Sequence, residues 1–275
     1  MAEAFRFITF LSDYGLEDEF VGVCRGVVKR LAPGVEILDI AHGIPPQDVS
    51  AGATVLAQAV RYMPPAVHLA IVDPGVGTPR RAVVIATASG LLVGPDNGLL
   101  WLATEALGGA TRAFAITNES LFLEAPSRTF HGRDIFAPVA ARLALGMALE
   151  EVGPPVPVEE LIRIEMPAAR VDDDHIHSRV VQIDHFGNLQ LNFGRSELEG
   201  IGVLLGDQIE VRMGGRSFKA PYSQAFSEVK KGGLILLEDS HRHLTLAVNM
   251  GNARETLEAR RGDPVIIARV QIGVN

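Results

Sequence analysis

Charged side chains cluster in a short loop that follows a run of apolar residues. Residues 67–72 are rich in β-formers and end abruptly at Asp73-Pro74-Gly75, which predicts a buried strand that stops at a tight loop. The loop continues to Arg80 and Arg81, so a carboxylate and two guanidiniums lie close together before the next apolar run begins. Charges held at a strand end lie where open α/β sheets bind their ligands. The alternative interpretation is a structural ion pair in a connecting turn.

A second carboxylate, Asp13, ends the first predicted strand. In a parallel sheet it opens onto the same edge as Asp73, and a carboxylate there can accept two hydrogen bonds from a ribose diol. The alternative is a helix-capping or turn aspartate. The surrounding sequence lacks the GxGxxG pattern, and the chain has no GxxxxGK[ST] pattern. A nicotinamide or flavin site and nucleoside triphosphate hydrolysis are therefore disfavoured.

His131 lies between Phe130 and Gly132, just before a predicted helix. An imidazole in such a loop can accept a proton or position a polar group. The alternative is a polar neighbour of the helix start. His42 and His68 are interpreted as structural.

A polar corner interrupts the strand pattern of the second half of the chain. Asp184 can hold an ammonium group, Asn188 can bridge amide or carboxylate groups, and Phe186 can cover an aromatic ring. The alternative is a β-bulge with its turn residues. Ser240 with Arg242 is a weaker candidate for binding a carboxylate.

Composition excludes several classes of function. The 275 residues carry a formal net charge of −8, which gives no electrostatic support to nucleic-acid or anionic-membrane binding. Cys24 is the single cysteine, so no internal disulfide or thiol metal site is expected, and a reducing cytoplasm is predicted. No segment reaches the ~18 apolar residues of a membrane span, and the N-terminal apolar run is too short for a secretion signal. The histidines lack HExxH-type spacing, so no metal is expected.

The apolar periodicity predicts the elements that position these residues. Strands are expected at 5–11, 36–40 and 67–72, separated by helices that begin near residue 20 and at residue 49. This alternation is typical of a parallel sheet covered on both faces. Further strands are expected at 82–86, 91–93 and 112–116, with helices at 99–107 and around 136–145.

The second half has an all-β pattern. Strands are expected at 179–183, 208–212, 234–237, 244–248 and 265–268, with glycine turns between several of them. The fold class predicted is α/β: an N-terminal α/β domain (1–168) with a mainly parallel central sheet, and a small C-terminal all-β, barrel-like domain (169–275).

In this order, the motifs resemble those of the S-adenosylmethionine (SAM) hydroxide adenosyltransferase family, relatives of the SAM-dependent fluorinase and chlorinase. They are Leu11-Ser12-Asp13-Tyr14-Gly15, the loop from Val72 to Thr78, Gly94-Pro95-Asp96-Asn97-Gly98, Phe130-His131-Gly132-Arg133-Asp134, and Asp184-His185-Phe186-Gly187-Asn188. The resemblance implies the two-domain fold predicted above and a homotrimer. In that trimer the ligand would lie between the first domain of one subunit and the second domain of its neighbour.

The resemblance also implies an activity, the hydrolysis of SAM to adenosine and L-methionine without a cofactor. An Asp-Arg-His set acting on water falls on Asp73, Arg80 and His131, with Arg81 as the alternative arginine. Substrate-binding roles carry over as follows: Asp13 for the ribose hydroxyls, Asp184 and Asn188 for the methionine ammonium, Ser240 for its carboxylate, and Phe186 near the adenosine.

Two other functions fit the same family. A SAM-dependent halogenase is disfavoured, because in the halogenases the position of Asp73 is not acidic and a long insertion follows the loop. A non-catalytic protein that binds adenosine or SAM is the third possibility. The C-terminal stretch around Asp239 and His241 departs from the family pattern, which weakens the role assigned to Ser240.

Overall fold

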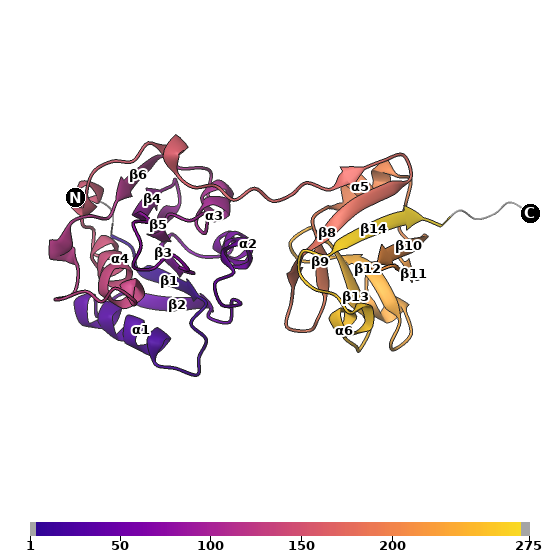
Figure 1. Cartoon of the computed structure of the whole chain (residues 1–275), viewed down its shortest axis with the longest axis horizontal. Helices are drawn as coiled ribbons and strands as arrows, with labels where there is room; N and C mark the ends of the chain where they lie inside the picture. Colours follow the sequence, from indigo (N-terminus) through magenta and orange to yellow (C-terminus); the bar gives the residue numbers. More distant parts are fainter. Residues whose placement is uncertain (1–3, 271–275) are drawn as a thin grey trace, which may run out of the picture. The chain divides into compact units, whose positions relative to one another are not determined.

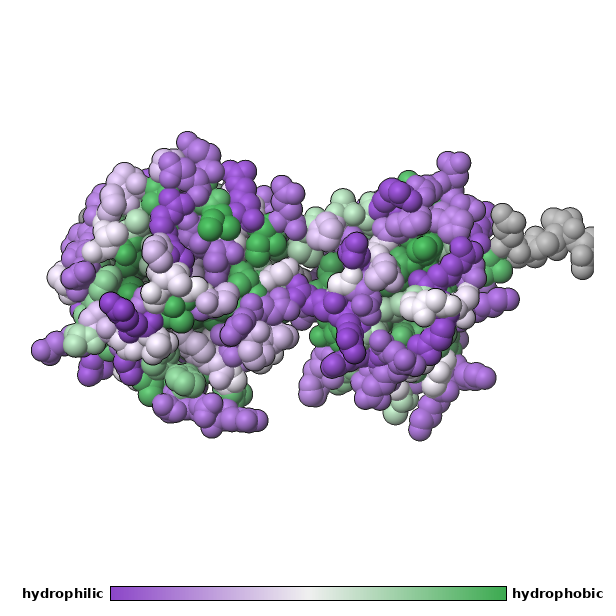
Figure 2. Space-filling view, in the orientation of Figure 1, coloured by the Kyte–Doolittle hydropathy of each residue, from purple (hydrophilic) through white to green (hydrophobic). Residues whose placement is uncertain are grey.

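The computed structural model describes residues 4–270 and divides the chain into two compact units, Met1–Ile164 and Glu165–Asn275 (Figure 1). The boundary expected after residue 168 lies in the segment 162–169, which has no regular secondary structure. Hydrophilic and apolar residues are interspersed on the visible surface of each unit (Figure 2). No helix among the described residues is long and apolar enough to cross a membrane.

The N-terminal unit is built on a six-stranded sheet with the order β2-β1-β3-β5-β4-β6. The neighbouring pairs among β2, β1, β3 and β5 are parallel, whereas β4 is antiparallel to β5 and β6. The predicted, mainly parallel sheet is thereby confirmed. The strands are β1 (Phe7–Ser12), β2 (Glu36–Ala41), β3 (Ala66–Ile71), β4 (Ala82–Ala86), β5 (Gly90–Pro95) and β6 (Arg112–Ala115).

Helices cover both faces of this sheet because successive strand residues point to opposite sides. In β1, Ile8 and Phe10 join one apolar core with α1 (Phe20–Leu31) and α4 (Ala137–Ala144). Leu11 joins a second core with α2 (Val49–Val60). The remaining helical segments of the unit are α3 (Trp101–Ala106), the 3₁₀ turns η1 (Glu119–Leu121), η3 (Leu149–Val152) and η4 (Val158–Glu160), and the π-helical η2 (Gly132–Phe136).

The C-terminal unit is an eight-stranded antiparallel sheet with the order β11-β10-β14-β8-β9-β13-β12, and β7 pairs with β8. A bridge between Tyr222 and Leu236 brings β11 and β12 together, so the sheet nearly closes around one apolar core. The predicted barrel-like unit is confirmed. Its elements are β7 (Arg170–Val171), β8 (His175–Ile183), β9 (Leu189–Leu191), α5 (Arg195–Gly200), β10 (Gln208–Met213), β11 (Arg216–Pro221), η5 (Phe226–Glu228), β12 (Leu234–Glu238), β13 (Leu244–Val248), α6 (Ala253–Leu257) and β14 (Pro264–Arg269).

The sequence pattern missed several short elements of the C-terminal unit. The helices α5 and α6 are too short to show a helical repeat, and β7 and β9 too short to show alternation.

Candidate active site

Asp73 and Arg80 form a buried ion pair in the loop after β3. Arg80 Nε lies 2.9 Å from Asp73 Oδ1 and 3.0 Å from Oδ2, and Arg80 Nη2 also donates to Oδ2. The two side chains are only 6% (Asp73) and 11% (Arg80) exposed, and the guanidinium lies 5.2 Å from the Phe136 ring centroid. The ion pair fixes the orientation of the Asp73 carboxylate, because the guanidinium binds it through two donors at once.

The Arg81 side chain points toward Asp96 and Glu160, away from Asp73. This distinguishes the two arginines, either of which could have contacted Asp73 on the sequence alone. Arg81 Nε and Nη1 bind Asp96 and Glu160 at 2.9 and 3.1 Å, and its Nη2 donates to the Glu160 carbonyl. Adjacent residues of an extended chain project to opposite sides. Arg80, not Arg81, is therefore the arginine that contacts Asp73.

His131 contacts the arginine of this pair. Its Nδ1 lies 2.9 Å from Arg80 Nη2. Because a guanidinium only donates, Nδ1 accepts, and in the neutral ring the proton is on Nε2. Burial, followed by the nearby Arg80 charge, lowers the pKa of His131 below its ordinary value, which favours this neutral form.

The backbone around His131 is unusual. His131 caps the π-helical segment Gly132–Phe136, and π-turns inside helices are frequent at functional sites. A Cβ at Gly132 would lie 2.2 Å from Tyr14 Oη, so only glycine fits here. Burial holds the pKa of Tyr14 above its ordinary value, and this tyrosine is therefore a neutral hydroxyl beside the site. Sequence reasoning missed Tyr14, although its place next to Asp13 was a signal.

Asp13 leaves β1 beside the end of β3, since Ser12 pairs with Ile71 in the parallel register. The backbone N–H of Gln47 donates to Asp13 Oδ2 at 2.8 Å, which orients the carboxylate. Ser12 Oγ lies 2.8 Å from His42 Nδ1, and this contact supports the same turn.

The motif Gly94-Pro95-Asp96-Asn97-Gly98 supports the loop that contains Asp73. Asn97 Nδ2 donates to the carbonyl of Val72, directly before Asp73, at 2.9 Å. Asp96 is buried, binds Arg81, and accepts from the Ile162 amide. Both residues act on the position of the loop rather than on a ligand.

In the C-terminal unit, Asp184, Phe186 and Asn188 share one turn between β8 and β9. Asp184 Oδ1 accepts from the amides of Phe186 and Asn188 at 2.9 and 2.8 Å, and Oδ2 accepts from Asn188 Nδ2 at 2.7 Å. Asp184 therefore stabilises this turn, as the alternative interpretation of the sequence predicted. Phe186 is 73% exposed, which leaves its ring free to cover a ligand.

Ser240 lies in a different turn, between β12 and β13, and is exposed. Asp239 organises this turn by accepting from the His241 and His243 amides at 2.8 and 3.1 Å. Within the N-terminal unit, then, the structure brings Asp73, Arg80 and His131 together with Asp13 on the neighbouring strand end. Ser240 shares no turn with Asp184. No cluster of three or more His, Cys, Asp or Glu side chains in residues 4–270 could hold a metal ion.

Models of known families match both units. The model described as SAM hydroxide adenosyltransferase N-terminal domain matches residues 8–153, and the model of the C-terminal domain of the same family matches residues 178–266. The chain belongs to the SAM hydroxide adenosyltransferase family.

Individual proteins agree with this assignment. The chain is 47% identical to the (R)-S-adenosyl-L-methionine hydrolase of Salinispora tropica over 93% of this chain and 95% of the relative. It is more distant from the fluorinase of Nocardia brasiliensis, with 29% identity over 97% of both chains. Among solved structures, an uncharacterized conserved protein from Thermotoga maritima is similar at a TM-score of 0.89, with 39% identity, 95% of this chain and 100% of that chain covered.

Proposed function

We propose that the protein hydrolyses S-adenosyl-L-methionine to adenosine and L-methionine by in-line attack of water on C5′. The observation that carries this proposal is the buried Asp73–Arg80–His131 arrangement. The relatives at 42–47% identity are named (R)-S-adenosyl-L-methionine hydrolases, which supports the same reaction here.

The contacts of Asp73, Arg80 and His131 support a role for each residue in this reaction. His131 Nε2–H donates to the water oxygen, and Asp73 accepts a water proton, because Arg80 occupies the other side of both groups. The O–C5′ bond forms as the C5′–S bond breaks, and the bonding electron pair stays on sulfur. The sulfonium becomes a neutral thioether, so the leaving group needs no acid. The proton that water loses passes to Asp73 and then to solvent. Orienting the water in this way lowers the entropic part of the activation barrier to attack on C5′.

The other predicted residues are proposed to bind the substrate. Asp13 would accept from the ribose hydroxyls with the oxygen that Gln47 leaves free. Asp184 and Asn188 would bind the methionine ammonium and Ser240 its carboxylate, while the exposed Phe186 would cover the adenosine.

Incubation of the purified protein with SAM in ¹⁸O-water tests the reaction. We expect adenosine labelled at the 5′ oxygen and one methionine per adenosine. A heat-inactivated sample is the control. Binding of SAM without turnover would instead identify a non-catalytic binding protein and contradict the proposal.

A halide as the nucleophile is the competing reaction, since fluorinases are relatives. Asp73 disfavours it, because its carboxylate repels an anion placed beside it, although the paired Arg80 offsets part of this repulsion. We expect added fluoride or chloride to yield no 5′-halogenated adenosine. We further propose that no cofactor takes part, because the sulfonium already supplies the leaving group; activity unchanged by EDTA would agree.

Assembly and location are also proposed. The family resemblance supports a homotrimer whose subunits share the sites, and light scattering of the purified protein measures its mass in solution. A cytoplasmic location agrees with the free thiol of Cys24, which is buried. Cell fractionation tests this location.

A further inference from the structure

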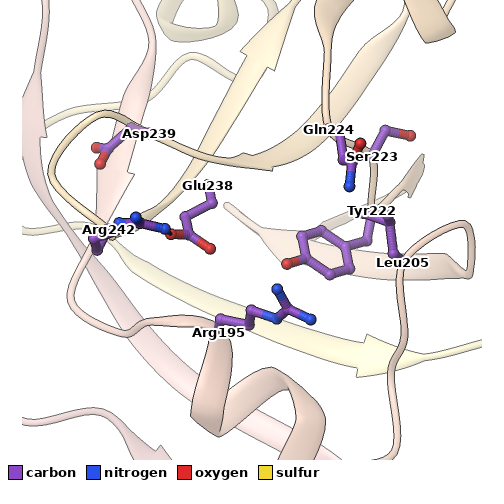
Figure 3. A pocket seen from close by; sticks show the side chains of 8 residues that line it. All are labelled: Arg195, Leu205, Tyr222, Ser223, Gln224, Glu238, Asp239 and Arg242. Atoms are coloured by element: carbon purple, nitrogen blue, oxygen red, sulfur yellow. Dashed lines mark hydrogen bonds and ion pairs between the residues drawn. The ribbon is translucent and has the colours of Figure 1, made fainter.

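A pocket of about 320 Å³ opens in the C-terminal unit between the start of α5, the end of β11 and the β12–β13 turn (Figure 3). Its polar lining includes Arg195, Tyr222, Glu238 and Arg242, and Leu205 adds an apolar wall. Its volume is at the lower end of the range for small-molecule sites, roughly 300–1,000 Å³. None of these residues has a role in the proposed hydrolysis.

Tyr222 contributes to this pocket a hydroxyl that has no partner among the described residues of the protein. The residue is 4% exposed, yet its hydroxyl forms no hydrogen bond with any other residue in the part of the chain that the structure describes. Figure 3 shows the hydroxyl pointing into the pocket, on the side of Glu238. Burial raises the pKa of Tyr222, so the phenol stays neutral and can donate. The hydroxyl is therefore a donor that an acceptor group of a ligand in the pocket could use.

Charges of both signs face the same space. Arg195 Nε binds Glu199 at 2.7 Å, and Figure 3 shows its guanidinium beside the Tyr222 ring, with the two Nη groups available. Glu238 lies across the pocket and binds Arg242 Nη1 at 2.9 Å through one oxygen, which leaves the other oxygen as an acceptor. A guanidinium and a phenol opposite a carboxylate complement a ligand with a negative and a positive group.

We propose that this pocket binds a free α-amino acid with an apolar side chain. Its carboxylate would contact Arg195 and the Tyr222 hydroxyl, its ammonium would contact Glu238, and its side chain would pack against Leu205. A simple anion would leave the second oxygen of Glu238 unused, and a simple cation would face Arg195 and Arg242, so a zwitterion fits best. Ser240 lies in the β12–β13 turn that borders the pocket but is not one of the residues that line it.

Calorimetric titration of the full-length protein with L-methionine tests the proposal. N-acetyl-L-methionine and L-methioninamide each remove one charge, and we expect both to bind at least ~10-fold more weakly, as for loss of a charge-assisted hydrogen bond. Arg195→Gln should weaken L-methionine binding at this site by a similar factor. Arg170→Gln, which alters an exposed ion pair with Asp172 elsewhere in the unit, should leave it unchanged.

Tyr222→Phe removes only the unpaired hydroxyl and keeps the ring in the core, so its fold should persist. We expect at least ~10-fold weaker L-methionine binding from the loss of one hydrogen bond to the ligand carboxylate. Hydrolysis of SAM by both pocket variants should keep its kcat and KM. The proposal is overturned if neither variant changes L-methionine binding. It is also overturned if the KM for SAM rises in both variants, since the pocket would then be part of the substrate site. If the wild-type protein does not hydrolyse SAM, that result contradicts only the proposed function and not the pocket proposal.

Discussion

At the scale of single residues, the site depends on which hydrogen-bonding groups remain free after the buried contacts are made. Arg80 uses its donors on Asp73 and on His131 Nδ1, so it fixes the orientation of both. The free groups are the unbound lone pairs of Asp73 and the Nε2–H of His131. These are an acceptor and a donor, which together can hold one water molecule.

Asp73→Asn keeps the size of the side chain but removes the proton acceptor. We expect kcat to fall by about 10²–10⁴-fold, the usual contribution of general acid–base catalysis, with a smaller change in KM. Asp13→Ala should mainly raise KM, because Asp13 is proposed to bind ribose. Steady-state kinetics separate these effects, and equal losses in kcat and KM for both variants would contradict the assigned roles. Thermal unfolding of each variant controls for the Arg80 charge left unpaired in Asp73→Asn.

The pH dependence of the reaction follows from His131. Its pKa is lowered by burial and by Arg80, so the ring is neutral at pH 7 and gains a proton only below its ordinary value of 6.5. The protonated ring carries a hydrogen on Nδ1 that faces the Arg80 donor, which breaks the arrangement. We therefore expect kcat/KM to be constant near pH 7 and to fall only at a pH below 6.5, the ordinary value. His131→Gln should have lower activity and lack this acid limb; an unchanged limb would assign it to another group.

At the scale of elements, the candidate residues are held by strand ends and tight turns. The parallel pairing of β1 with β3 places Asp13 and Asp73 at one edge of the sheet, and Asn97 fixes the carbonyl before Asp73. In the C-terminal unit, Gly187 adopts a φ of 82° and packs on Asn252. This contact joins the turn that contains Asp184 to the start of α6.

Gly187→Ala should test this turn. A Cβ there would lie 2.0 Å from Asn252 Oδ1, in addition to the cost of a positive φ. Gly215 has a similar φ of 73° with no atom within 4 Å of its Cβ position, so Gly215→Ala is a matched control for backbone strain alone. We expect a loss of about 1 kcal/mol for Gly215→Ala and roughly 1–3 kcal/mol more for Gly187→Ala. Scanning calorimetry measures both; equal losses would show that the Asn252 contact contributes nothing.

At the scale of the whole molecule, each unit has its own apolar core, and the proposed catalytic and methionine-binding residues are divided between the two units. The proposed trimer predicts that a complete site draws on two chains. Co-expression of Asp73→Asn with Asp184→Asn chains, each weakly active alone, should then restore up to about a quarter of wild-type activity by random assembly. Asp184→Asn keeps an oxygen acceptor for the turn. No recovery in mixed trimers would contradict shared sites.

The sequence by itself determined the alternation of strands and helices, the change to an all-β pattern, and the motifs that carry the family resemblance. These features depend on local periodicity and on residue type, which can be read from short stretches of the chain without knowing its distant contacts. The carboxylate of Asp73 and its position after a buried strand were also predictable for this reason.

Tertiary structure decided which side chains meet. The choice of Arg80 over Arg81 depends on the direction of each side chain, and the role of Tyr14 depends on the approach of the distant Gly132. The neutral state and tautomer of His131 depend on burial and on the Arg80 donor. Such contacts join residues far apart in the chain, and no local pattern encodes them, because the packing of the sheet and its helices sets the distances.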